Sequence, residues 1–186
     1  MPLFRMLRLA SMAGLGAMTM VACSTTATKP IPPVDRVDLP RFMGDWYVIA
    51  HVPSFIERNA YDAVETYRLD AEGLIQTTFR YRNGGFDEPV KAMHPTGTVR
   101  PDTGNAVWGM QFIWPIKAEY VVVHLNDDYS QTIVGRSARD YAWIMARSPT
   151  IPAADLDAHL RRLGELGYDL KDVRKVPQSG RPLPAE

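Results

Sequence analysis

The feature that most constrains the fold is a succession of short runs rich in β-forming residues, each separated from the next by a turn signal. Asn83-Gly84-Gly85 and Pro101-Asp102-Thr103-Gly104 are the strongest of these signals. The runs cover residues 46–51, 63–69, 74–81, 90–99, 106–112, 120–125, 131–135 and 141–146. Because an up-and-down barrel joins consecutive strands and leaves no open sheet edge, we predict an all-β, eight-stranded antiparallel barrel.

A helix is predicted after the last of these runs. Leu156, Leu160 and Leu163 recur at helical spacing within residues 153–166, and Gly167 is a stop signal. Residues 169–173 predict one more short strand, and residues 178–186 read as a loose tail. The barrel and its helix together occupy residues 41–177, which is the size of one domain.

The N-terminal segment has the pattern of a secretory signal. Arg5 and Arg8 precede an apolar run over residues 9–22, and Cys23 follows directly. This order resembles the lipobox of bacterial lipoproteins, which implies that residues 1–22 are removed and that Cys23 is acylated. Ser24 then implies sorting to the outer membrane, facing the periplasm. The alternative is an incidental cysteine in a signal that is cut elsewhere. Residues 23–40, rich in Thr and Pro, are predicted to be the lipidated Cys and a flexible tether.

Composition argues against several function classes. The 21 basic and 21 acidic side chains balance, which gives no electrostatic reason for nucleic-acid binding. Cys23 is the only cysteine, so the barrel has no thiol for catalysis. The four histidines are scattered without metal-ligand spacing, and no serine stands in a G-x-S-x-G context. We therefore predict no metal, no cofactor and no catalytic residue.

Three short motifs in order resemble a known family. They are Gly44-x-Trp46, Asp128-Tyr129 after the sixth run, and Arg147 after the eighth. These match the three signature regions of lipocalins, and the stretches GDWYVIA, NAVWGMQFIWPIKAEY, DDYSQTIVG and DYAWIMARSPTIP are similar to bacterial outer-membrane lipocalins. The resemblance implies a barrel with the C-terminal helix packed outside it. It also implies storage or transport of fatty acids and phospholipids, particularly lysophospholipids, for membrane maintenance.

The signature residues should meet at one end of the barrel. In an up-and-down barrel, the link after strand six and the end of strand eight lie at the end where strand one begins. Trp46, Tyr129 and Arg147 should therefore converge, with Arg147 stacked on the indole of Trp46. By resemblance, these residues with Gly44 and Asp128 form a structural plug at the closed end.

The other end should open onto an apolar pocket. Once Trp46 is placed inward, period-two alternation and the family's strand parity assign the residues that face the interior. That lining suits an acyl chain. Within it, Tyr120 and Tyr141 are candidates for headgroup contacts, whereas His124 is expected to lie deep and to serve packing. The predicted pocket residues are Val48, Ala50, Glu65, Tyr67, Thr77, Phe79, Tyr81, Met93, Trp108, Met110, Phe112, Tyr120, Val122, His124, Tyr141 and Trp143.

Three functions remain open at this point. The leading one is a lipid carrier with a fatty acid or a (lyso)phospholipid as ligand and a membrane attachment through Cys23. The second is a structural envelope protein with a filled barrel, which binds a partner through an apolar rim at the open end. The third is a lipid-modifying enzyme in which Glu65 and an inner Tyr act as an acid–base pair. The rim also predicts contact with a membrane, a lid or a homodimer, and its residues are Phe55, Ile56, Phe86, Trp114 and Ile116.

Overall fold

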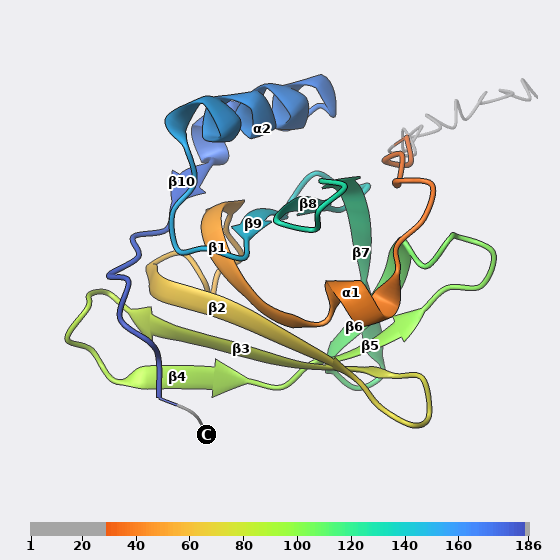
Figure 1. Cartoon of the computed structure of the whole chain (residues 1–186), viewed down its shortest axis with the longest axis horizontal. Coiled ribbons are helices and arrows are strands. Elements are labelled where there is room, and N and C mark those ends of the chain that lie inside the picture. Colours follow the sequence, from red (N-terminus) through yellow and green to blue (C-terminus); the bar gives the residue numbers. More distant parts are fainter. Residues whose placement is uncertain (1–28, 185–186) are drawn as a thin grey trace, which may run out of the picture.

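The computed structural model describes residues 29–184, and it confirms the all-β barrel (Figure 1). The sheet runs in the order β10-β1-β2-β3-β5-β6-β7-β8-β9, and β1 also pairs with β9, which closes it. Because β4 and β5 continue one another along β3, and β10 is a two-residue addition to β1, the barrel has eight strands. The strands are β1 Gly44–Val52, β2 Ala60–Leu69, β3 Ile75–Asn83, β4 Val90–Met93, β5 Thr96–Val99, β6 Val107–Ile113, β7 Ile116–Leu125, β8 Gln131–Gly135, β9 Ala142–Ala146 and β10 Arg174–Lys175.

The predicted strand over residues 90–99 is interrupted at His94-Pro95. Proline has no N–H to donate to a ladder, so the pairing is broken there. The Pro95 carbonyl still accepts a hydrogen bond from the Thr77 N–H at 3.0 Å. Beyond the break, β5 continues along β3 and pairs on its other side with β6.

Two α-helices accompany the barrel within residues 29–184. The predicted one, α2 Ala153–Glu165, packs outside it, where Leu156 and Leu163 share a buried cluster with Ile133 of β8 and Ile144 of β9. The other, α1 Leu39–Phe42, was missed because one turn is too short to show periodicity. No helix among residues 29–184 has the length and apolar character needed to cross a membrane.

The predicted strand at 169–173 is wrong. The Asp169 carboxylate caps the N–H of Lys171 and begins a 3₁₀ helix, η1 Leu170–Asp172. An Asp that bonds its own following backbone competes with strand pairing. The sheet is rejoined only at β10, where Lys175 pairs with Ala50 of β1.

The segment before the barrel is not a free tether from Lys29 onward. Ile31 and Val37 are buried, and the Val34 N–H donates to the Val122 carbonyl at 2.8 Å. The Val37 N–H donates to the Gly104 carbonyl at 2.7 Å. Residues 29–37 are therefore held against the barrel, with Ile31 in the cluster outside it and Val37 in the interior cluster at the closed end.

The predicted loose tail is also fastened to the barrel, at least to residue 184. The side-chain amide of Gln178 donates to the carbonyls of Val48 and Ala63 at 2.8 and 3.1 Å. The Asp62 carboxylate accepts from both the N–H and the hydroxyl of Ser179, at 2.6 and 2.9 Å. Asp62 lies at an irregularity in the β2–β3 pairing, so the tail fills hydrogen bonds that the ladder cannot.

Candidate ligand cavity

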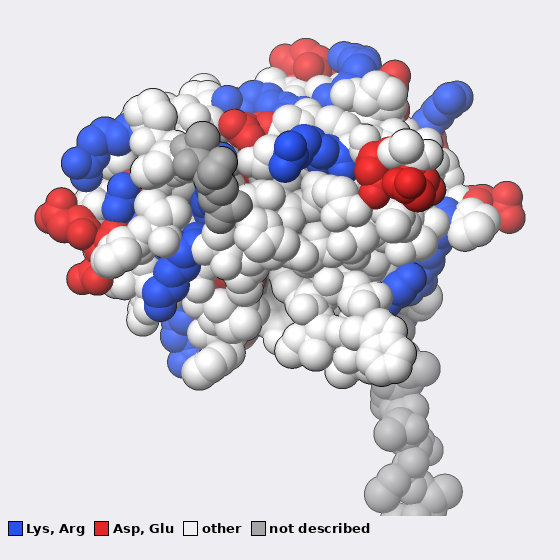
Figure 2. Space-filling model, turned by 90° about the horizontal axis from the view of Figure 1, so that it is seen from below, with Lys and Arg blue, Asp and Glu red and all other residues white. Residues whose placement is uncertain are grey.

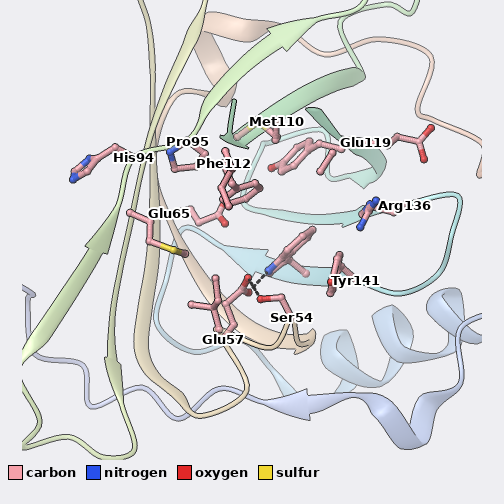
Figure 3. Close-up of a pocket in the computed structure, with 16 residues that line it drawn as sticks. Ser54, Glu57, Glu65, His94, Pro95, Met110, Phe112, Glu119, Arg136 and Tyr141 are labelled. Carbon is pink, nitrogen blue, oxygen red and sulfur yellow. Dashed lines mark hydrogen bonds between the residues drawn. The ribbon is translucent and has the colours of Figure 1, made fainter. Parts of the chain in front are cut away.

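A cavity of about 450 Å³ opens between the β1–β2 link, the β4–β5 break, β6, β7 and the β8–β9 link (Figure 3). That volume falls within the range of small-molecule sites in proteins. Seven of the predicted pocket residues lie on its wall: Glu65, Met93, Met110, Phe112, Tyr120, Tyr141 and Trp143. Residues that the prediction did not include complete the wall: Ser54, Ile56, Glu57, His94, Pro95, Ile113, Ala118, Glu119 and Arg136.

The half of the barrel nearer the closed end is filled with side chains. Most of the other predicted pocket residues are among these packed side chains. Trp108 stacks on Tyr120 with ring centroids 4.7 Å apart and an angle of 3° between the planes. Phe42 of α1 meets Trp108 edge-on at 5.4 Å. Seven predicted pocket residues are buried in the interior but absent from the cavity wall: Val48, Tyr67, Thr77, Phe79, Tyr81, Trp108 and Val122. Alternation gave these residues the correct face, but it carries no information on whether bulky rings leave a void.

Ala50 and His124 were placed on the wrong face, each because of a β-bulge. The register of β1 against β9 shifts between Val48 and Ala50, so Ala50 joins the outer cluster beneath α2. The register of β7 against β8 shifts between Val122 and His124, and the His124 ring lies 5.2 Å from that of His159 on α2. One extra residue reverses the facing of everything after it.

The bulge in β1 has a second consequence, because it turns His51 inward beside Glu57. The Nδ1 atom of His51 lies 3.6 Å from Glu57 Oε2, and the imidazole is 1% exposed. Glu57 accepts hydrogen bonds at 2.8 Å from the indole of Trp143 and from the hydroxyl of Ser54, as the dashed lines in Figure 3 show. Sequence reasoning missed this group because Glu57 lies in a link that was treated as surface.

At the floor of the cavity, Glu65 joins two tyrosines. The Tyr67 hydroxyl donates to Glu65 Oε2 and also lies 2.7 Å from the Tyr120 hydroxyl. Glu65 keeps some accessible surface because it faces the cavity, but it lies deep in the barrel. Burial, with a smaller contribution from the charge of Glu57, raises the pKa of Glu65 to about 8. The same burial, with the nearby Glu65, raises the pKa of Tyr120 well above its ordinary value. The floor is therefore uncharged at neutral pH.

Charged groups gather at the mouth instead. The Arg136 guanidinium lies 5.0 Å from the ring centre of Tyr141 and 3.0 Å from the Asp140 carboxylate. Glu119 accepts a hydrogen bond from the Ser137 N–H at 2.7 Å. Of the two headgroup candidates, Tyr141 lies at the mouth beside a cation, whereas Tyr120 forms part of the floor.

The structure brings the signature residues together at the closed end. The Arg147 guanidinium lies 3.8 Å over the ring of Trp46 and donates to the carbonyls of Asp45, Arg41, Phe42 and Met43 at 2.7–3.0 Å. Three of those carbonyls lie at the C-terminal end of α1, so Arg147 caps that helix.

The remaining members of this closed-end cluster hold the neighbouring turns. Gly44 has φ +93, a conformation that suits glycine, and an added Cβ would lie 3.4 Å from Arg147. The Tyr129 hydroxyl accepts from the Asp38 N–H at 2.8 Å. Asp128 accepts from the Ser130 N–H at 2.9 Å, and hydrogen bonds to Ser130 lower its pKa. Through these contacts, α1 and the turn at Tyr129 are tied to the end of the barrel at which β1 begins.

Two predicted features need separate mention. Cys23 lies outside the described residues. Within residues 29–184, no group of three or more His, Cys, Asp or Glu side chains is arranged to hold a metal ion.

Comparison with known proteins identifies the family. A family model described as a lipocalin-like domain matches residues 37–178. The chain is 29% identical over 163 residues to temperature-induced lipocalin-1 of Arabidopsis thaliana, covering 84% of this chain and 88% of that protein. It is 28% identical over 172 residues to outer membrane lipoprotein Blc of Escherichia coli K12, covering 90% and 95%.

Solved structures show the same fold at lower identity. Insecticyanin of the tobacco hornworm Manduca sexta superposes with a TM-score of 0.61 at 19% identity, covering 78% of this chain and 83% of that one. The cockroach allergen Per a 4 superposes with a TM-score of 0.59 at 20% identity, covering 77% and 89%. With the family model matching most of its length, the chain belongs to the lipocalin-like family.

Proposed function

We propose that this lipocalin binds a single lipid in its open-end cavity and stores or carries it for membrane maintenance. The observation that carries the proposal is a cavity of about 450 Å³ with a largely apolar wall and an uncharged floor. Fatty acids and phospholipids, particularly lysophospholipids, are the proposed ligands. Binding involves no covalent step.

The chemistry of the wall supports an acyl chain held above the aromatic filling. Ile56, Met93, Met110, Phe112 and Ile113 supply most of the apolar contact. Each methylene removed from water contributes about 0.8 kcal/mol. Because rings fill the closed-end half, the chain ends at the Glu65–Tyr120 floor, and a polar headgroup stays at the mouth near Arg136. A carboxylate or a phosphate can pair there with the guanidinium.

The proposed location is the outer membrane, with the protein anchored through an acylated Cys23 and facing the periplasm. Relatives from Escherichia coli, Citrobacter freundii and Vibrio cholerae are named outer membrane lipoproteins. The apolar run of residues 9–22 followed by Cys23 supports the same anchor here.

The test is a lipid titration of wild-type protein and two matched variants. Ala118 lies on the cavity wall in β7, so Ala118→Phe fills the space that the chain would occupy. Ala92→Phe is the control. Ala92 lies in β4, where it pairs with Arg80 of β3, and it is absent from the cavity wall. After delipidation, lysophosphatidylcholine and palmitate are titrated separately, with native mass spectrometry for stoichiometry and the total tryptophan fluorescence for saturation.

We expect one lipid per protein for wild type and Ala92→Phe, and at least about tenfold weaker binding for Ala118→Phe, which corresponds to about 1.4 kcal/mol. The absence of saturable binding to the wild-type protein would overturn the proposal. Function would then be sought at the apolar rim, where the alternative of a structural envelope protein that binds a partner would be tested.

A further inference from the structure

The strongly exposed large apolar side chains of the described residues are concentrated at the mouth of the cavity. Six of the eight belong to the β1–β2 link or the β6–β7 hairpin, and the other two are Leu69 and Leu170. Phe55 is 87% exposed and Trp114 is 81% exposed. These six residues form the apolar rim as the structure has it: Phe55, Ile56, Phe112, Ile113, Trp114 and Ile116. The predicted rim residue Phe86 is only partly exposed, because its ring packs against Tyr61 at 5.1 Å. Since Ile56, Phe112 and Ile113 also line the cavity, the rim and the mouth are continuous.

The exposed charges on the rim segments are basic. Within residues 53–59, Glu57 is buried and bonded to Trp143, which leaves Arg58 as the exposed charge. Within residues 112–117, the only charged residue is Lys117, which is exposed. Figure 2 shows white, uncharged surface along the lower edge of the molecule, with blue Lys and Arg side chains on both sides of it. Apolar side chains with an exposed Trp and flanking bases suit the interface of a bilayer, where Trp is enriched and anionic headgroups attract Lys and Arg.

The described chain also begins at this end of the barrel. Arg139 in the β8–β9 link donates to the Lys29 carbonyl, and the Ile31 N–H donates to the Ser137 hydroxyl at 3.1 Å. Ser137 in turn donates its N–H to Glu119 on the cavity wall. From there the chain runs along the barrel toward the closed end, where Val37 bonds Gly104.

This path shortens the distance from the proposed anchor to the mouth. Only residues 24–28 separate Cys23 from Lys29. Six chain steps span at most about 20 Å when fully extended. If residues 29–40 were free, the reach would be several times longer and the barrel could turn either way. Because they are bound along the barrel, an anchor at Cys23 would lie within about 20 Å of Lys29, which is beside the mouth.

We propose that the apolar rim docks on the bilayer surface, so that the cavity mouth faces the leaflet that holds the Cys23 anchor. A lipid would then pass between leaflet and cavity without crossing water. The orientation rests on the proposed anchor, whereas the docking rests on the rim itself.

Trp114 offers a direct readout of this contact. The other tryptophans, Trp46, Trp108 and Trp143, are at most 7% exposed. The full acylated protein is reconstituted into phosphatidylethanolamine and phosphatidylglycerol vesicles, with and without brominated acyl chains. The signal of Trp114 is the difference between wild type and Trp114→Phe. We expect a blue shift and loss of most Trp114 emission in brominated vesicles. Ile113→Ser should weaken this quenching, while Leu170→Ser, which alters an exposed apolar residue outside the rim, should not.

Three outcomes would overturn the proposal. Unquenched Trp114 in protein that remains with the vesicles would mean that the mouth faces away. A blue shift that rises with protein concentration in the absence of vesicles would assign the rim to a second copy of the chain. Quenching that is unchanged by Ile113→Ser would exclude the rim as the contact.

Failure of the proposed function would be recognised separately. The mass of the Cys23 peptide reports acylation, and the lipid titration with Ala118→Phe reports the cavity. If Cys23 proves unacylated, sedimentation of the full chain with the same vesicles tests the rim alone, and a chain that stays in the supernatant overturns the docking.

Discussion

Glu65 shows how position within the barrel sets the charge of a single residue. Its carboxyl group faces the cavity and accepts a hydrogen bond from Tyr67 deep in the barrel. With the pKa near 8, the acid retains its proton at neutral pH. A charged carboxylate there would be left without solvation beside the apolar end of an acyl chain, so the neutral form keeps the floor compatible with that chain.

We predict that Glu65 makes the protein less stable as the pH rises. Between pH 4.5 and about 8 the unfolded chain releases a proton that the native protein retains. The free energy of unfolding therefore falls with rising pH by up to about 1.4 kcal/mol per pH unit, and levels off above the native pKa. Glu65→Gln should remove this slope in urea unfolding measured from pH 6.5 to 9, above the range in which His124 and His159 contribute an opposite slope. Glu88→Gln, on the exposed β3–β4 link, should keep it, and parallel curves for Glu65→Gln and wild type would contradict the assignment.

At the scale of elements, α2 is held to the barrel partly through a histidine pair. His124 of β7 packs on His159 of α2, and the imidazole of His159 lies 2.7 Å from the side-chain oxygen of Gln131. Burial lowers the pKa of His159 to about 4, helped by the charges of His124 and Arg162 and opposed by Asp155. Burial and Arg162 also lower the pKa of His124, although its bond with Asn126 acts in the other direction.

Acid should therefore loosen the docking of α2. Below pH 6.5 the histidines of the unfolded chain bind protons, whereas the packed histidines stay neutral. The free energy of unfolding therefore falls as the pH falls toward 4. Amide hydrogen exchange, corrected for its intrinsic pH dependence, should show weaker protection of residues 153–165 at pH 5 than at pH 7. His159→Gln should reduce that difference, while His94→Gln, at the exposed β4–β5 break, should leave it unchanged. Equal protection at both pH values would exclude the pair as a determinant.

At the scale of the whole molecule, the barrel is closed at one end and open at the other. Arg147, α1 and Trp46 seal one end, and the apolar rim surrounds the other. The N-terminal segment connects the two ends. It runs from Lys29 beside the mouth to Val37, which donates a hydrogen bond to Gly104 at the closed end (Figure 1). Sealing one end leaves the cavity open at the other end, beside which the described residues begin at Lys29.

Removing the seal should destabilise the entire barrel. Arg147→Lys keeps the charge but cannot reach the four carbonyls at 2.7–3.0 Å with one ammonium group. We expect a loss of about 2–4 kcal/mol in the free energy of unfolding. The control Arg161→Lys, on the exposed face of α2, should change it by less than about 0.5 kcal/mol. Urea denaturation measures both, and similar values for the two variants would show that Arg147 is not part of the seal.

Local sequence was sufficient for the strand order, the helix α2 and the meeting of Trp46, Tyr129 and Arg147. Alternation of side chains and turn residues act over a few positions, and an up-and-down barrel follows from consecutive strands with short links. The apolar segments at the open end were likewise visible in the sequence.

Only the tertiary structure decided the cavity. Ala50 and His124 lie on the opposite face because bulges depend on how two strands pair, and no single strand records its partner's register. The rings of Trp108, Tyr67 and Phe42 come from different elements and pack against one another, and together they fill the closed-end half of the barrel. Similarly, Glu57 becomes buried only when its link folds onto Trp143. Faces follow from the chain's own periodicity, whereas voids and buried charges follow from contacts between residues far apart in it.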